Sequence, residues 1–145
     1  MTQVIKFRAW DKNFGQMLHK GVSDYYKGDE LAIRLDGELL YVESGEINKP
    51  RNNYILMQYT DLKDQDGKEI YEGDILEFYV GLNEQKEPAQ REVGTVEWNP
   101  TEARYRAGRW TLDSFWASRS KVIGNIYEDP EITKYSNKYS RVWQH

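Results

Sequence analysis

Residues Leu56–Phe78 read LMQYTDLKDQDGKEIYEGDILEF, and this stretch decides the fold. The pair Asp66-Gly67 lies between apolar residues. A two-residue loop between strands needs the positive φ that glycine accepts and aspartate tolerates. We therefore predict a hairpin or tight loop over residues 65–68, followed by a second turn at Glu72-Gly73-Asp74 and a strand over residues 75–80. The predicted structural turn residues are Asp66, Gly67, Gly73 and Asp74.

Short alternating segments flank this stretch on both sides. A second Asp-Gly pair, Asp36-Gly37, predicts another hairpin, while polar residues predict loops over 44–53 and 81–90. Many short strands separated by turns favour a mainly β chain, built as a small barrel or sandwich, with an SH3-like barrel in the C-terminal half. The expected strands cover residues 4–10, 16–22, 31–35, 39–42, 54–60, 92–98, 104–112 and 121–127.

The loop over residues 44–53 is the expected boundary if the chain has two lobes. This boundary predicts an N-terminal region of β-hairpins over residues 1–53 and a β-barrel-like region over residues 54–132. We expect residues 133–145 to form a tail or a short helix, because their aromatic residues recur at roughly helical spacing. A single domain is the alternative, since 145 residues suit one domain or two very small ones.

Four stretches of the chain together resemble the YopX family of small phage and prophage proteins. They are Val4–Asp11, Leu56–Thr60, Asp66–Ile75 and Val122–Glu131, in the family's order along about Val4 to Ile132. The resemblance implies a phage or prophage origin and a largely β fold. It implies no reaction and no catalytic residues, because the family has no established activity.

The composition of the chain excludes several kinds of bond and partner. The chain has no cysteine, which excludes disulfides and thiolate metal ligands and suits a reducing compartment. We find no signal-peptide pattern and no apolar run long enough to span a bilayer, so we expect the host bacterial cytoplasm and no membrane partner. The net charge of −4 opposes nucleic-acid binding unless a local basic face exists.

The titratable residues predict neither a metal site nor an enzyme. If Gly67 took the invariant sixth position of a calcium loop, Leu62 and Gly73 would fall at ligand positions, where neither can bind. The two histidines, His19 and His145, stand in no recognisable triad or zinc pattern. The carboxylates between Glu69 and Glu77 are better explained as a solvated acidic hairpin. We therefore predict no metal, no cofactor and no catalytic residues.

The segment over residues 98–121 is the best candidate binding surface. It is rich in cations, with Glu102 and Asp113 as its acids, and aromatic residues including Trp98, Tyr105 and Phe115 are interleaved. Such residues suit a protein interface, and they also suit phosphates and stacked bases. Alternatively, the aromatics belong to a barrel core with solvated arginines outside. The predicted surface residues are Arg104, Arg106, Arg109, Trp110, Trp116, Arg119 and Lys121.

The function predicted from the sequence is that of a non-enzymatic phage or prophage accessory protein. It would act by binding protein, including copies of itself as a homo-oligomer, because aromatic-rich β chains expose edges that self-pairing covers. The alternative is a nucleic-acid-binding module that uses the arginine and aromatic face around residues 98–121.

Overall fold

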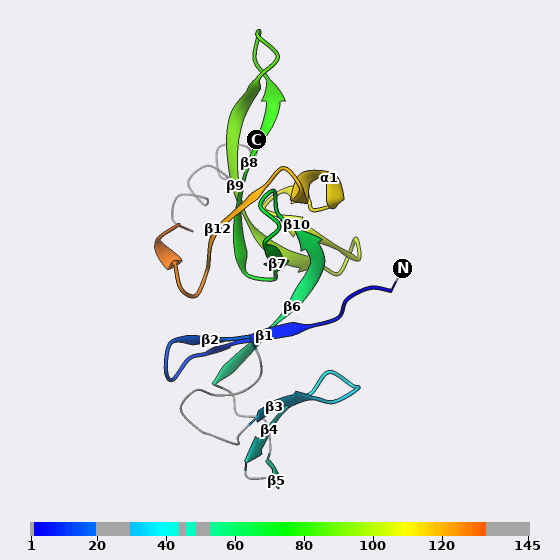
Figure 1. Ribbon diagram of the computed structural model, residues 1–145, viewed down its shortest axis with the longest axis vertical. Coiled ribbons are helices and arrows are strands. Elements are labelled where there is room, and N and C mark those ends of the chain that lie inside the picture. The colour runs from blue at the N-terminus through cyan, green and yellow to red at the C-terminus, as the bar shows by residue number, and fades with distance from the viewer. Residues whose placement is uncertain (1, 20–29, 44–45, 49–52, 133–145) are drawn as a thin grey trace. The chain divides into compact units, whose positions relative to one another are not determined.

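Antiparallel β-sheets make up most of the protein in the computed structural model (Figure 1), so the predicted mainly β fold is confirmed. The structure describes residues 2–19, 30–43, 46–48 and 53–132. Two compact units make up the chain, one of residues Lys6–Gln58 and one that joins Met1–Ile5 to Tyr59–His145. The division at residue 53 inferred from composition stays a prediction.

The unit Lys6–Gln58 holds part of a four-stranded antiparallel sheet, in the order β2 (Gln16–Leu18), β1 (Phe7–Asp11), β6 (Tyr54–Lys63) and β7 (Glu69–Tyr71), and one smaller sheet. In the first, β1 pairs with both β2 and the start of β6, so that Ala9 lies opposite Leu18 and Leu56. Asp11 shapes the turn after β1, because its Oδ1 accepts hydrogen bonds from the amides of Asn13 and Phe14. The strands are β1 (Phe7–Asp11), β2 (Gln16–Leu18), β3 (Glu30–Ile33), β4 (Leu39–Glu43), β5 (Glu46–Asn48) and β6 (Tyr54–Lys63).

The second sheet of this unit has the order β3-β4-β5. The predicted Asp36-Gly37 hairpin joins β3 to β4, with Gly37 at a φ of 89°. The loop predicted over residues 44–53 is partly wrong, because β5 lies within it and pairs with β4. Three residues with one apolar side chain, Ile47, are too few to show an alternating pattern.

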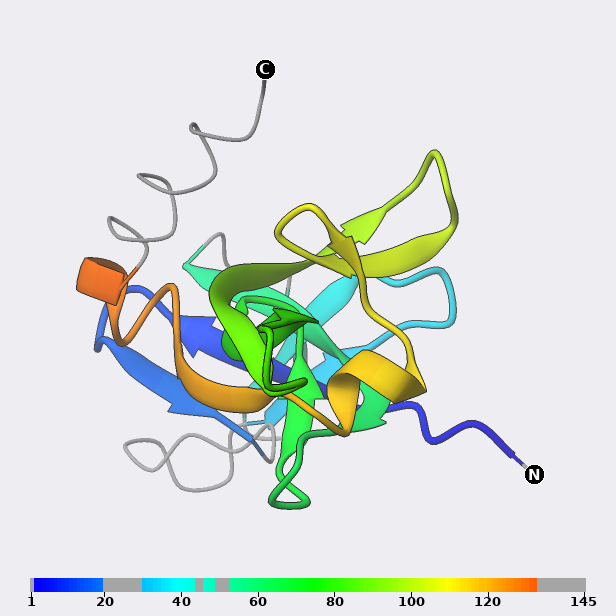
Figure 2. The same ribbon diagram turned by 90° about the horizontal axis from the view of Figure 1, so that it is seen from above.

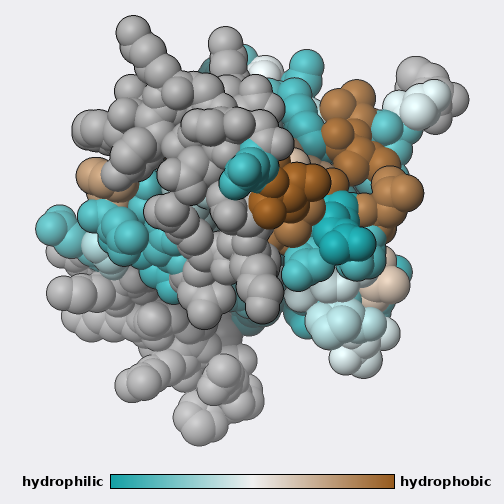
Figure 3. Space-filling model, turned by 90° about the horizontal axis from the view of Figure 1, so that it is seen from below, coloured by the Kyte–Doolittle hydropathy of each residue, from teal (hydrophilic) through white to brown (hydrophobic). Residues whose placement is uncertain are grey.

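Figure 3 shows hydrophobic side chains reaching the surface among hydrophilic ones.

The other unit is built on a five-stranded antiparallel sheet in the order β11-β10-β9-β8-β12. The strands bend along their length (Figures 1 and 2), and the curled sheet forms a half-barrel, which fits the predicted small barrel. Its elements are β7 (Glu69–Tyr71), β8 (Asp74–Leu82), β9 (Pro88–Asn99), β10 (Arg104–Ala107), β11 (Trp110–Thr111), α1 (Ser114–Ala117) and β12 (Lys121–Asn125).

One hydrophobic cluster fills the concave side of this sheet. Leu76, Phe78 and Val80 alternate along β8 and point into it, as the period of two requires. The sheet also brings two backbones close together at Gly94, where a Cβ would stand 2.5 Å from the carbonyl carbon of Ala107. The buried members of the cluster are Ile70, Leu76, Phe78, Val80, Val96, Ala107, Leu112, Ala117 and Val122.

The central stretch Leu56–Phe78 closes this unit through buried aspartates. Asp64 Oδ1 accepts hydrogen bonds from the amides of Asp66 and Lys68, each at 2.9 Å, and thereby shapes the hairpin between β6 and β7. Its Oδ2 accepts the amide of Val122 at 3.0 Å, which ties the hairpin to β12. The residue is only 6% exposed, so these bonds are shielded from water.

The second turn of the stretch uses the same kind of contact. Asp74 is 2% exposed and its Oδ2 accepts the amide of Tyr71 at 2.8 Å. Gly67 and Gly73 have φ values of 80° and 84°, a region that side chains rarely adopt. Asp64, Asp74 and the two glycines therefore serve the backbone of this unit.

Two further expectations are wrong in detail. The loop predicted over residues 81–90 is half strand, because β8 runs to Leu82 and β9 begins at Pro88, with a tight turn at Asn83–Glu87 between them. The single strand predicted over residues 104–112 is a hairpin, since Gly108 has a φ of 62° and the chain reverses between β10 and β11. The tail or short helix predicted for residues 133–145 lies outside the described residues.

Candidate protein-binding surface

A chain of ring contacts leads from the core of the half-barrel to its surface. Trp116 lies at the centre, with ring centroids 5.8 Å from Phe78, 5.7 Å from Trp110 and 5.2 Å from Phe115. Phe78 is 2% exposed, whereas Phe115 is 52% exposed. We call Trp110, Phe115 and Trp116 the aromatic cluster. Its rings bury one side against the core and leave Phe115 open to a partner.

The short helix α1 places two members of this cluster. Asp113 caps the helix with an extended backbone, and its Oδ1 accepts the amide of Trp116 at 2.9 Å. Ala117 is 1% exposed and anchors the helix in the core. Phe115 and Trp116 are therefore presented on a fixed piece of backbone.

Two arginines lie over rings of the aromatic cluster. The Arg119 guanidinium is 3.7 Å from the centroid of Phe115, and its Nη1 donates to the Phe115 carbonyl at 3.0 Å. The Arg109 guanidinium is 5.0 Å from the centroid of Trp110 and forms an ion pair with Glu92 at 3.4 Å. Cation–π contacts of this kind favour arginine and hold its flat group in place.

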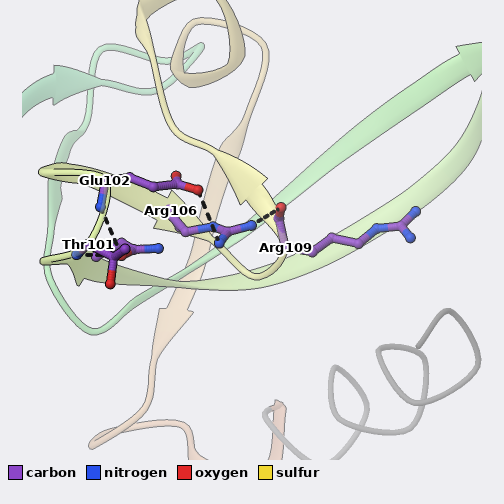
Figure 4. Close-up of polar contacts among 5 residues, drawn as sticks. Thr101, Glu102, Arg106 and Arg109 are labelled. Atoms are coloured by element: carbon purple, nitrogen blue, oxygen red, sulfur yellow. Dashed lines mark hydrogen bonds and ion pairs between the residues drawn. The ribbon is translucent and has the colours of Figure 1, made fainter. Parts of the chain in front are cut away.

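Arg106 contacts the backbone and a carboxylate and does not lie over a ring of the aromatic cluster. Its Nη2 donates to the carbonyl of Arg109 at 2.6 Å, and its Nη1 lies 4.0 Å from a carboxylate oxygen of Glu102. Figure 4 shows that the Arg109 side chain extends away from Arg106. Arg106 thus supports the turn between β10 and β11, and part of its charge is neutralised by Glu102.

The structure brings together four of the seven residues predicted for this surface. Trp110 and Trp116 are joined by ring contact, and Arg109 and Arg119 lie on the same cluster. Arg104 and Arg106 occupy alternate positions on β10, opposite in direction to Tyr105. Within the described chain, no hydrogen bond, ion pair or cation–π contact links Arg104 or Lys121 to the cluster.

Sequence reasoning missed two residues that contact this surface, Phe115 and Glu92. Phe115 is one of the interleaved aromatics and is absent from the predicted surface residues. The spacing of Asp113 before Trp116 is an N-cap signal that could have placed both aromatics on one short helix. Glu92 lies 17 residues before Arg109, and the pairing of β9 with β10 brings the two side chains together.

Burial changes the acidity of one aromatic side chain beside this surface. Tyr105 packs against the core and lies edge-to-face on Trp98 at 5.1 Å. Loss of solvent raises the pKa of Tyr105 above its ordinary value of 10.0, and the negative charge of Glu72 raises it further. The phenol is therefore held neutral.

The acidic stretch between Glu69 and Glu77 is dispersed by the fold. Asp74 accepts a backbone amide, and Glu77 pairs with Arg91 at 2.7 Å on the neighbouring strand. Across the residues whose positions are described, no group of three or more His, Asp or Glu side chains is placed to hold a metal ion.

Comparison with known protein families shows which family the chain belongs to. The YopX protein family model matches residues 6–134. The chain belongs to the YopX family. In the described residues, no helix has the length and apolarity needed to cross a membrane.

Two solved structures have a fold similar to that of this chain. The crystal structure of protein EF1440 from Enterococcus faecalis has a TM-score of 0.57 at 25% identity, covering 90% of this chain and 99% of that one. The crystal structure of YopX from Bacillus subtilis has a TM-score of 0.55 at 20% identity, covering 87% of this chain and 93% of that one. No curated protein matches the chain.

Proposed function

We propose that this YopX-family chain is a phage- or prophage-encoded accessory protein that acts in the host bacterial cytoplasm by binding protein, including copies of itself. The observation that carries the proposal is the aromatic cluster with its two stacked arginines. Tryptophan and arginine are the residue types that dominate binding energy at protein interfaces. Here they are held by the core on one side, so little conformational entropy is lost when a partner covers the other.

The placement of three arginines favours protein over nucleic acid as the partner. Arg109 pairs with Glu92, Arg106 lies near Glu102, and Arg91 pairs with Glu77. A phosphate would have to displace these carboxylates. Nucleic-acid affinity comes mainly from cations that neutralise phosphates, so paired arginines contribute little to it.

A non-enzymatic role is supported by what the acidic residues do. Carboxylates are the plainest candidates for acid–base chemistry in this sequence. Asp64 and Asp74 are buried and accept backbone amides, which fixes turns of the half-barrel. Their positions are explained by folding.

A pull-down from induced host cells tests the proposal. The bait is the full chain with and without Phe115→Ala, and each sample is divided and treated with nuclease or left untreated. We expect protein partners, a second copy among them, that survive nuclease and are reduced by Phe115→Ala. Partners lost on nuclease treatment, together with a gel shift of oligonucleotides at low salt, would instead establish nucleic-acid binding.

A further inference from the structure

The apolar stripe of β8 continues past the core of its own molecule. Leu76, Phe78 and Val80 share one side of the strand and are 0%, 2% and 8% exposed. Beyond Gly81, which has a φ of 69°, Leu82 is the next apolar residue and is 67% exposed. Figure 1 shows the β8–β9 hairpin extending beyond the rest of its sheet. Leu82 therefore stands where the hairpin has left the cover of its own core.

The end of this hairpin has a fixed shape. The amide of Asn83 donates to the carbonyl of Glu87 at 2.8 Å, and Asn83 Oδ1 accepts the amides of Gln85 and Glu87. The turn carries two glutamates and one lysine, Lys86. Within the described chain the Glu84 carboxylate has no partner, while Glu87 accepts a long hydrogen bond from the Asn83 side chain. We call Leu82 with Glu84 the hairpin tip, an apolar group beside an unpaired negative charge.

The aromatic cluster presents the opposite combination. Phe115 is exposed, and Arg119 lies over its ring. The guanidinium donates through Nη1 to a carbonyl and to Ser118 Oγ, and no carboxylate of the described chain contacts it. A guanidinium has five N–H donors, so Nε and Nη2 remain available for a carboxylate. Phe115 with Arg119 is the receiving patch, an apolar group beside an unpaired positive charge.

We propose that the hairpin tip of one copy binds the receiving patch of a second copy, with Leu82 against Phe115 and Glu84 against Arg119. Both features are then explained by one contact: the exposed apolar groups bury each other and the two unpaired charges meet. In a two-fold dimer the contact forms twice, because each copy offers one tip and one patch. This inference rests on the proposed function and names its partner.

Charge exchange between the two sides tests the pairing. Sedimentation equilibrium on the full chain, from micromolar to millimolar concentration, gives the association constant for the wild type, Glu84→Lys, Arg119→Glu and the double variant. Each single reversal places like charges together twice in a dimer, so we expect association about tenfold weaker or more. The double variant restores opposite charges, and we expect it to associate within about threefold of the wild type.

Mixing the two single variants provides a second measurement. One carries a lysine on its tip and a normal patch, and the other carries a normal tip and a glutamate on its patch. An equal mixture should associate like the wild type, because both contacts in the mixed dimer have opposite charges. Asp66→Lys and Lys68→Glu are matched controls, since they make the same charge changes on a different exposed turn and should leave association unchanged.

The inference is overturned if the wild type stays monomeric, if the single variants associate as the wild type does, or if the double variant remains weak. Thermal unfolding of each variant shows whether it is folded, and all substituted positions are exposed. The pull-down separates this inference from the proposed function. A monomeric chain that still captures host proteins through Phe115 would refute self-pairing alone.

Discussion

Replacing Asp64 with asparagine should destabilise the half-barrel far more than replacing Asp66 with asparagine. Asparagine can place its one carbonyl oxygen where Oδ1 accepts the amides of Asp66 and Lys68. Its NH₂ group then faces the amide of Val122, donor against donor, in a site that is 6% exposed. Losing a hydrogen bond to a charged group and leaving a buried amide unpaired costs about 3 kcal/mol.

Urea unfolding of Asp64→Asn and Asp66→Asn measures this difference. Asp66 is exposed and its carboxylate contacts no described residue, so its substitution should cost about 0.5 kcal/mol or less. Amide hydrogen exchange adds a local measurement, because Val122 should lose protection in Asp64→Asn before the rest of β12 does. Equal unfolding midpoints for the two variants would refute the assigned role of Asp64.

Three other outcomes follow from the same unit. Gly94→Ala would put a Cβ 2.5 Å from the Ala107 carbonyl carbon, and it should lower the free energy of unfolding in urea by about 3 kcal/mol. Gly67→Ala meets open space but keeps a φ of 80°, so it should lower the free energy of unfolding by about 1 kcal/mol. Because the pKa of Tyr105 is raised in the folded state, its contribution to stability is complete below pH 10 and is lost as pH rises further. Wild type should therefore lose more stability than Tyr105→Phe in alkaline unfolding, and equal losses would contradict the shift. Chelator treatment should leave the melting temperature unchanged, and a drop of several degrees would reveal a metal site.

Local chemistry made the turns of the fold predictable. In Asp66-Gly67 and in Asp36-Gly37 the glycine accepts the positive φ that a tight turn between strands requires. Both predicted hairpins are present. The sequence predicts a loop in place of the hairpin over residues 81–90 because its exposed, polar residues lack an apolar pattern. Strand pairing, rather than burial, holds it together. Gly108 shows the same limit, since one glycine suits a bulge as well as a reversal.

The candidate surface was only partly predictable because its contacts are long-range. Composition located Trp110 and Trp116 in the right segment, but the ring contact between them depends on α1 folding back onto the core. The pairing of Arg109 with Glu92 depends on the register of β9 against β10. The hydrogen bond between the Val122 amide and Asp64 joins residues 58 positions apart, and no local sequence pattern predicts it.

The stretches that identify the family explain the fold better than they explain the activity. In Leu56–Phe78, Asp64 and Asp74 accept backbone amides, and Thr60 Oγ1 donates to the Ile70 carbonyl at 2.7 Å. These contacts fix the half-barrel whatever the surface carries. The hairpin tip and the receiving patch lie outside those stretches, at positions where side chains are exposed and can change without cost to the core. A relative that keeps Asp64 and Asp74 but lacks opposite charges at the positions of Glu84 and Arg119 should therefore share the fold and not the self-pairing, which sedimentation of such a relative would test.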